Sequence, residues 1–296
     1  MNSVSALRAL AGMMAAGLLS ACSAAAPLNA LANKGPWTVR SSQYAEGSRQ
    51  GVDVYTPAGA TRNPVIVFFY GGNWDSGDKA SYRFVAASLA ERGYVVVVPD
   101  YRVYPQVRFD GFMQDGAQAV AWTKRNIAKF GGDASRVFVM GHSAGAHIAA
   151  MLSLDERWLG AVGLTPRRDI AGLIGVAGPY DFLPLGSAKL RDIFSGGDIA
   201  RTQPINFANG NEPPALLLHG SGDTTVEPGN TARLATRLRA KGNDARAIIY
   251  PNVGHADIIG AVSPLLKQIA PVVDDVDRFV RSHSGGRARD IKRSAS

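Results

Sequence analysis

The sequence alternates between short runs of apolar residues and longer stretches in which apolar residues recur at the spacing of one helix face. Residues 94–98 are a near-continuous β-branched run, which is typical of a strand buried on both faces of a sheet. Phe84, Val85 and Leu89 instead follow helical spacing. This alternation predicts a mostly parallel sheet with helices on both faces. The predicted strands are residues 52–55, 65–69, 94–98, 136–140, 170–177, 215–218 and 245–250, and the predicted helices are 82–92, 112–130, 143–154, 230–241 and 263–282.

The beginning of the chain has a different pattern. Arg8 supplies a positive charge and residues 9–19 form an uncharged apolar stretch, a layout that is typical of an export signal. The next residues complete the segment 19–22 (Leu-Ser-Ala-Cys), which resembles the lipobox of bacterial lipoprotein signal peptides. The resemblance implies that the thiol of Cys22 receives a diacylglyceryl group, that cleavage occurs just before it, and that the new amino terminus is acylated.

Two other interpretations of this region remain open. Residues 30–32 or 24–26 could form an ordinary small-residue cleavage site, although the first lies far beyond the apolar stretch and Pro27 follows the second. The stretch 9–33 could also stay as a membrane anchor, although Pro27 makes its second half a poor span. Ser23 stands where an Asp would favour inner-membrane retention. We therefore expect the lipid-anchored protein in the bacterial outer membrane, facing the periplasm.

Composition excludes several classes of protein. The chain is 46% hydrophobic and 19% charged, which excludes a disordered chain. A single cysteine excludes an intramolecular disulfide, a Cys-rich zinc module and an iron–sulfur cluster. The net charge is +8, and residues 281–296 hold five basic residues against Asp290, so half of the excess lies in this tail. We expect no nucleic-acid partner, because charge is the only feature that suggests one.

The chain shows no internal repeat and no interdomain linker, so we expect one catalytic domain. It contains no group of potential ligands at metal-site spacing and no dinucleotide fingerprint after an early strand, so no metal and no cofactor are expected. The oligomeric state does not follow from the sequence. The expected divisions are a signal peptide at residues 1–21, a spacer at 22–35, the catalytic domain at 36–282 and a basic disordered tail at 283–296.

Residues 141–145 (Gly-His-Ser-Ala-Gly) have the G-x-S-x-G pattern, which is weak evidence when it stands alone. Here it directly follows a predicted strand and begins a helix of small residues. Such a sharp turn holds Ser143 in a strained conformation at the carboxyl end of the sheet, beside a helix amino terminus that favours negative charge. Ser143 is therefore the candidate nucleophile. The alternative is that it only caps the helix.

A serine nucleophile needs a base, and the base needs an acid that orients it. If the order along the chain is Ser, acid, His, only His255 and His283 come late enough, and His283 lies in the tail that we expect to be disordered. His255 follows the last predicted strand. Asp223 follows the preceding one and is the candidate acid. Asp257 is an alternative, but it lies so close to His255 that a local backbone contact is the better interpretation.

Donors for a developing oxyanion are the third requirement. Gly71 and Gly72 follow the predicted strand at 65–69, and adjacent glycines leave N–H groups that can point into a site. The N–H of Ala144, next to the nucleophile, is the other candidate. A simple Gly-Gly turn is the alternative.

Residues 70–154, together with the segments around Asp223 and His255, resemble the carboxylesterase branch of the α/β-hydrolases, which includes enzymes similar to hormone-sensitive lipase, arylformamidase and prenylcysteine methylesterase. The resemblance covers about residues 36–282. It implies a mostly parallel eight-stranded sheet with helices on both faces and a short cap, and ester hydrolysis through an acyl-enzyme. The matching segments are Gly71-Gly72-x-Trp74, Pro99-Asp100-Tyr101-Arg102, Gly132-Asp133, Gly141 to Ala146, His219-Gly220-x-x-Asp223 and Gly254-His255.

The resemblance also bears on the substrate pocket. Tyr70, which we expect in the substrate pocket, stands where the family usually has His before the two glycines, and this leaves the substrate preference open. Trp74 is expected to form an apolar wall. His142 and His147 are expected either to be structural or to shape the pocket, and His147 could touch the substrate because it shares a helix face with the nucleophile. His219 is interpreted as structural or pocket-shaping too, and the structural residues are Asp100, Tyr101, Arg102 and Asp133.

The segment 178–213, where this fold often carries a cap, is short, which favours small acyl groups. The expected function is therefore a serine carboxylesterase that acts on acetyl to butyryl esters. Two alternatives remain: a hydrolase of amide, formamide or peptide bonds with the same triad, and a membrane-anchored binding protein with a vestigial site.

Overall fold

The computed structural model describes residues 26–30, 32 and 35–285. Within these residues an eight-stranded sheet has the order β1-β2-β4-β3-β5-β6-β7-β8. β2 pairs antiparallel with β1 and β4, and the remaining neighbours pair in parallel. The strands are β1 (Trp37–Gln43), β2 (Gly51–Pro57), β3 (Asn63–Phe69), β4 (Val95–Pro99), β5 (Gly132–His142), β6 (Gly172–Val176), β7 (Ala215–Gly220) and β8 (Ala245–Tyr250).

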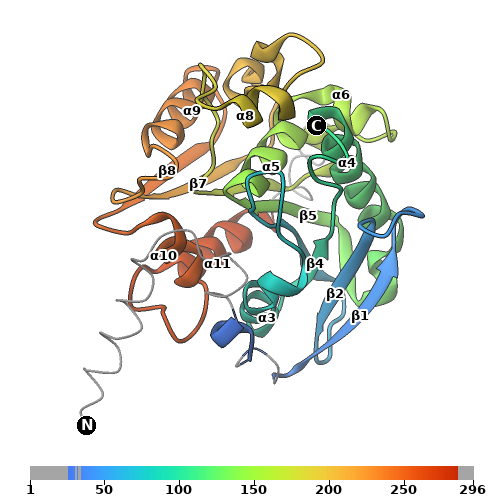
Figure 1. The fold of residues 1–296 in the computed structure, drawn as a ribbon. Helices are drawn as coiled ribbons and strands as arrows, with labels where there is room; N and C mark the ends of the chain where they lie inside the picture. The colour runs from blue at the N-terminus through green and yellow to red at the C-terminus, as the bar shows by residue number, and fades with distance from the viewer. Residues whose placement is uncertain (1–25, 31, 33–34, 286–296) are drawn as a thin grey trace, which may run out of the picture.

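Helices cover both faces of this sheet. Figure 1 shows α3 (Arg83–Glu91) and α11 (Val272–His283) on one face, with α4 (Phe109–Asn126), α5 (Ala144–Leu154) and α9 (Gly229–Ala240) on the other. The shorter elements are η1 (Ala80–Tyr82), η2 (Ile127–Phe130), α6 (Glu156–Gly160), α7 (Pro166–Asp169), α8 (Ala188–Ile193), η3 (Ile199–Thr202), η4 (Pro204–Phe207) and α10 (His255–Gly260). The predicted layered architecture is confirmed.

Burial explains why the central strands were recognisable. All five residues of β4 are buried, as are the last five of β3, because helices cover the sheet on each side. The carboxyl ends of β5, β6, β7 and β8 lie along one edge of the sheet, since these strands are parallel. This edge receives the residues that follow β5, β7 and β8, which include three of the predicted site residues.

Three features differ from the sequence prediction. β1 was missed because it is an edge strand whose side chains are mostly exposed, so it has no buried apolar run. The predicted helix at 263–282 begins only at Val272, directly after Pro271, and residues 263–271 form turns. His283 was expected in a disordered tail, but it ends α11, where its Nδ1 lies 2.8 Å from the carbonyl oxygen of Phe279.

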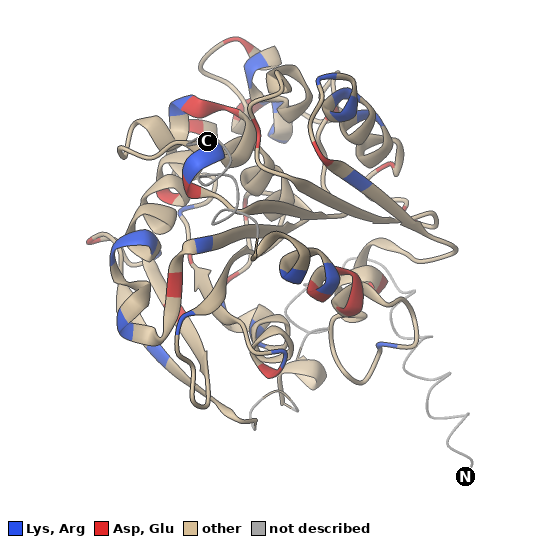
Figure 2. Cartoon of the chain, turned by 180° about the vertical axis from the view of Figure 1, so that it is seen from behind, with Lys and Arg blue, Asp and Glu red and all other residues tan. Residues whose placement is uncertain are grey.

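Charged residues of both signs are interspersed over the helices and loops around the sheet, as Figure 2 shows. No helix among the described residues is long and apolar enough to span a membrane. Cys22 and the basic residues from 286 onward lie outside the described residues. The predicted signal peptide at residues 1–21 and its cleavage site before Cys22 lie outside them too.

Candidate active site

Ser143 lies in a sharp turn between β5 and α5. Its φ of 55° and ψ of −122° place it in a conformation that non-glycine residues rarely adopt. Glycines on both sides make this turn possible: a Cβ on Gly141 would overlap the carbonyl of Gly145, and a Cβ on Gly145 would overlap the carbonyl of Phe69. The Ser143 side chain makes no capping hydrogen bond to α5, so the alternative that it only caps the helix is wrong.

The hydroxyl of Ser143 belongs to a chain of hydrogen bonds that joins the ends of three strands. Ser143 Oγ lies 2.9 Å from Nε2 of His255, and Nδ1 of His255 lies 2.7 Å from Oδ2 of Asp223. His255 begins α10 just after β8, and Asp223 follows β7. The side chain of Asp223 is fully buried, whereas that of His255 is 17% exposed. This is the geometry of a nucleophile, a base and an orienting acid.

Asp223 is held as an anion by several donors. Burial by itself would raise the pKa of its carboxyl, but hydrogen bonds from His219, His255 and the N–H of Val226 outweigh burial and hold that pKa well below its usual range. The N–H groups of Thr225 and Val226 each donate to Oδ1 over 2.9 Å. The carboxylate therefore keeps its charge and fixes the Nδ1–H tautomer of His255.

His219 bonds to the triad acid Asp223, which the sequence did not predict. Its Nε2 lies 3.0 Å from Oδ2 of Asp223, and its Nδ1 lies 2.8 Å from the hydroxyl of Thr231. His219 is the last residue but one of β7 and is fully buried. The spacing of four residues between His219 and Asp223 was visible in the sequence, but it did not reveal that the two side chains bond. Asp257 accepts a hydrogen bond from the N–H of Gly254 over 3.0 Å, which confirms the expected local backbone contact.

The candidate oxyanion loop follows β3. Gly72, Asn73 and Trp74 have φ values of 136°, 50° and 59°, so the chain turns through three consecutive residues in the left-handed region. The carbonyl of Gly72 accepts from the N–H groups of Asp75 and Ser76, each over 3.0 Å, which closes the turn.

This turn brings backbone N–H groups close to the nucleophile. Gly71 packs so tightly there that a Cβ added to it would lie 3.1 Å from Cβ of Ser143. Gly72 and Asn73 line the hollow beside Ser143, and within the described residues no hydrogen bond uses their N–H groups. Ala144 adjoins Ser143 in the first turn of α5. The three expected donor positions therefore surround Ser143, and the N–H of Asn73 is a further candidate.

Two hollows meet at Ser143. The first has a volume of about 210 Å³ and mostly apolar walls, and the second has about 380 Å³ and carries several charged side chains. Ser143, Asn73 and Thr225 line both. The walls of the first hollow, called the apolar hollow below, also include Leu28, Gly72, Tyr82, Phe84, His142, His255, Ala256, Asp257, Ile259, Gly260 and Leu266. The second, called the polar hollow below, is also lined by Trp74, Pro179, Asp181, Phe182, Leu183, Leu190, Val226, Glu227, Asn230 and Arg233.

The four expected pocket residues do not share one role. Trp74 lines the polar hollow and His142 lines the apolar one. Tyr70 lines neither: it is fully buried, and its hydroxyl donates to Asp100 over 3.0 Å. His147 is also fully buried and lines neither hollow, because it lies beneath Trp74. Neither Tyr70 nor His147 therefore lines the pocket, and the contacts of His147 fit its interpretation as a structural residue.

His142 and His147 are both neutral. Nδ1 of His147 accepts from the indole N–H of Trp74 over 3.2 Å, and its Nε2 lies 2.8 Å from the carbonyl of Thr202. Burial lowers the pKa of His147 to about 4. Burial, reinforced by the nearby His255, lowers the pKa of His142 to about 3. Neither ring is therefore charged at neutral pH.

The residues interpreted as structural have structural contacts. Tyr101 donates its hydroxyl to the carbonyl of Tyr70 over 2.7 Å, and Arg102 forms an ion pair with Asp115 over 2.7 Å. Asp100 accepts from the N–H of Lys79 over 2.8 Å. Asp133 accepts from the hydroxyl of Ser135 over 2.6 Å and from Arg136 over 3.2 Å.

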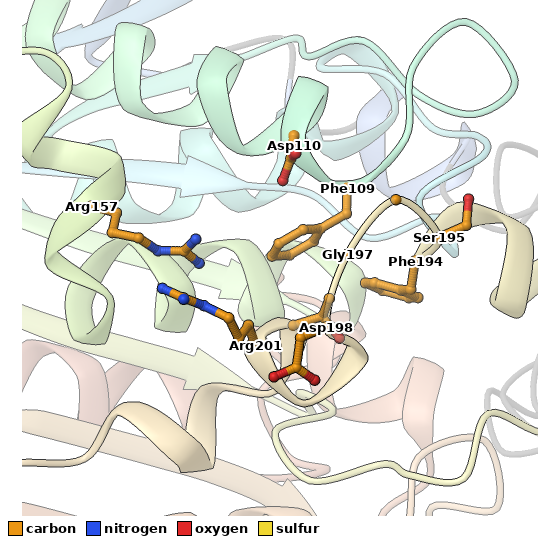
Figure 3. Close-up of a pocket in the computed structure, with 10 residues that line it drawn as sticks. Phe109, Asp110, Arg157, Phe194, Ser195, Gly197, Asp198 and Arg201 are labelled. Carbon is orange, nitrogen blue, oxygen red and sulfur yellow. The ribbon is translucent and has the colours of Figure 1, made fainter.

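A third hollow of about 190 Å³ lies outside this site. Figure 3 shows Arg157 and Arg201 facing one another across it, with Phe109 and Phe194 beside them. The ring of Phe194 contacts that of Trp74 at a centroid distance of 4.9 Å, so these two rings separate the third hollow from the polar one. Among the described residues no group of three or more His, Cys, Asp or Glu side chains is placed to hold a metal ion.

The strand order, the helices on both faces and the Ser143–His255–Asp223 chain at the strand ends define an α/β-hydrolase fold. Residues 52–238 match the model of the BD-FAE family, and the protein belongs to that family.

Similar proteins include isoprenylcysteine alpha-carbonyl methylesterase ICME of Arabidopsis thaliana, which is 30% identical over 246 residues, or 74% of this chain and 56% of the relative. Esterase LipC of Mycobacterium tuberculosis is 29% identical over 237 residues, or 73% of this chain and 59% of the relative. The chain spans just over half the length of these curated relatives. The hyperthermophilic esterase of Pyrobaculum calidifontis shares the fold, with a TM-score of 0.74 at 22% identity over 89% of this chain and 92% of that structure.

Proposed function

We propose that this protein is a serine hydrolase that cleaves carboxylic esters through an acyl-enzyme. The observation that carries the proposal is the continuous hydrogen-bond chain from Ser143 through His255 to the buried anion of Asp223. The esterase names of several relatives support it.

The geometry supports a two-step reaction. Nε2 of His255 takes the proton of the Ser143 hydroxyl as Oγ attacks the carbonyl carbon of the ester, and backbone N–H groups at residues 71–73 and 144 stabilise the oxyanion. His255 then returns the proton to the leaving alcohol oxygen, and the acyl group remains on Ser143. In the second step His255 takes a proton from water, the hydroxyl attacks the acyl carbon, and the acid leaves as Oγ is reprotonated. Asp223 remains ionised throughout and stabilises the imidazolium.

The size of the apolar hollow supports a preference for short acyl groups, from acetyl to butyryl. Its volume of about 210 Å³ is below the roughly 300–1,000 Å³ that is usual for ligand pockets. The polar hollow, which carries Arg233, Asp181 and Glu227, would then take the alcohol part of the ester. Faster hydrolysis of long-chain triglycerides than of butyrate esters by the purified protein would contradict this preference.

A second candidate is hydrolysis of a formamide or another amide by the same residues. Kynurenine formamidase of Salmo salar is 31% identical over 156 residues, or 52% of this chain and 50% of that protein. Since both reactions use the same nucleophile and base, a panel of matched esters and amides separates them. Higher kcat/KM for the amides would favour this candidate.

We also propose that the protein is exported and anchored to the outer membrane by lipids on Cys22. Leu28, which lines the apolar hollow, comes six positions after Cys22, and six residues span at most about 22 Å. A lipidated Cys22 would therefore hold this hollow close to the bilayer. Cys22→Ser should release the protein from the membrane fraction, and the mature wild-type chain should begin with an acylated Cys22 by mass spectrometry.

The decisive experiment replaces the nucleophile. Ser143→Ala should lower kcat for p-nitrophenyl butyrate by about 10⁶-fold and abolish labelling by a fluorophosphonate. Ser195→Ala is the matched control, since Ser195 is exposed and bonds only locally to the carbonyl of Asp192. Full turnover by Ser143→Ala, or a wild-type protein that never labels, would contradict the proposal. The second result would favour an anchored binding protein with a vestigial site.

A further inference from the structure

One wall of the apolar hollow comes from a remote part of the chain. Leu28 belongs to the short helical segment 26–30 ahead of β1, yet it lines the same hollow as Ser143 and His255. Among residues 26–30 it alone is buried, with 9% of its surface exposed. The segment therefore contacts the body through one apolar side chain that faces the site.

A neighbouring side chain holds this segment in place. Nδ2 of Asn29 donates to the carbonyls of Ala80 and Ser81 over 3.1 and 2.9 Å, and its Oδ1 accepts from the N–H of Phe84 over 3.0 Å. Figure 1 shows the segment, in blue, beside α3.

These bonds also provide a hydrogen-bond partner for the first turn of helix α3. The N–H of Phe84 lies in the first turn of α3, where amide groups have no partner inside the helix. Tyr82, at the N-cap position, makes no capping side-chain bond, so Asn29 supplies this bond from outside the helix. Tyr82 and Phe84 are themselves walls of the apolar hollow. Asn29 thus fixes Leu28 to a stretch of chain that also lines the pocket.

We infer that segment 26–30 is part of the substrate pocket and limits the length of the apolar group that the enzyme accepts. Leu28 is the specificity-determining residue, and Asn29 is a positioning residue that holds it. The inference rests on the proposed esterase function. The expected substrates are esters whose apolar part ends before Leu28. The side chain of Leu28, rather than the triad, excludes esters with longer apolar chains.

The test is a chain-length profile measured on the full protein. We compare kcat/KM for p-nitrophenyl acetate, butyrate and octanoate in the wild type, Leu28→Ala and Asn29→Ala. Leu28→Ala should raise the octanoate-to-acetate ratio about tenfold, because about two more methylene groups can then be buried. Asn29→Ala should move the ratio in the same direction, since it releases the same wall. Leu28→Trp should lower the butyrate-to-acetate ratio.

Leu265→Ala is the matched control, because Leu265 is 51% exposed and lines neither of the two hollows at Ser143 nor the third hollow. It should leave all ratios unchanged. An unchanged octanoate-to-acetate ratio in a folded Leu28→Ala protein, or an equal fall for every ester, would overturn the inference. If Leu28→Ala does not fold, Leu28→Met and Leu28→Trp decide in its place by the butyrate-to-acetate ratio. Failure of the proposed function is distinct, because Ser143→Ala would then retain hydrolysis.

Discussion

Two regions that differ in construction meet at the hydroxyl of Ser143. The triad stands on the ends of β5, β7 and β8, and its acid is fully buried and holds several hydrogen bonds. The apolar hollow is formed by loops, by the start of α3, by α10 and by segment 26–30. The first region is fixed by the sheet, whereas the second is assembled from segments that lie far apart along the chain.

This difference predicts two kinds of mutational effect. A change at the triad removes stabilisation of every transition state, so all esters should lose rate together. A change in the wall of the hollow alters how one part of the substrate is bound, so ratios between esters should move. If substitutions at the triad and in the wall of the hollow changed the rates for all esters in the same way, the two regions would not have separate roles.

After replacement of the nucleophile itself, the largest effect is expected at the acid. Asp223→Asn should lower kcat by about 10⁴-fold for acetate and butyrate esters alike, because an amide no longer fixes the Nδ1–H tautomer of His255. Steady-state kinetics with both esters measure this. Asp257→Asn is the comparison variant, since Asp257 bonds to the N–H of Gly254. A greater loss in Asp257→Asn would show that the acid has been assigned to the wrong residue.

The oxyanion loop should come next. Gly72 has a φ of 136°, and a Cβ there would overlap the carbonyl of Ser76, so Gly72→Ala must displace the loop. We expect kcat to fall by roughly 10²- to 10³-fold, the usual cost of a misplaced oxyanion donor. Gly160→Ala is the control, since nothing lies within 4 Å of a Cβ at Gly160. If kcat fell less than threefold in Gly72→Ala, this loop would not supply the oxyanion donors.

The same difference explains what the sequence could predict. Ser143 and Asp223 follow buried strands that stand out as apolar runs, whereas His255 follows the partly exposed edge strand β8. Parallel strands bring their carboxyl ends to one edge of the sheet. Their meeting therefore follows from pattern and order along the chain. Seven of the eight strands were predictable from their apolar runs, whereas β1 has no buried run and the eight-stranded sheet was implied only by the family resemblance.

The pocket walls were less predictable because they depend on tertiary contacts. Tyr70 and His147 lie next to the motifs in sequence, but one hydroxyl turns toward Asp100 and the other ring lies beneath Trp74. Leu28 gave no signal at all, since a leucine near an export signal has an apolar neighbourhood in any case. Among the described residues, the contacts of Asn29 with the start of α3 hold Leu28 at the site.

The support beneath Trp74 should be sensitive to acid. Folding lowers the pKa of His147 from 6.5 to about 4, so the unfolded chain takes up this proton first as the pH falls. The free energy of unfolding is therefore at its full value above pH 6.5. It falls by roughly 3 kcal/mol as the pH is lowered from 6.5 to 4. Thermal melts from pH 7 to pH 4 measure this. His147→Gln should make the dependence less steep, and His142, whose pKa is also lowered, accounts for part of the loss that remains. An equally steep loss in that variant would assign the effect to other groups.

The smallest effect is expected at His219, which acts on the triad through Asp223. Since the carboxylate can only accept, His219 donates its Nε2–H over 3.0 Å, and the hydroxyl of Thr231 donates to its Nδ1. His219→Leu removes one charge-assisted bond and should lower kcat about tenfold for every ester, with KM unchanged. His219→Gln, which retains a donor, should recover part of this loss. If both variants instead altered the octanoate-to-acetate ratio, His219 would belong with the pocket walls, and the separation between the two regions would not hold at β7.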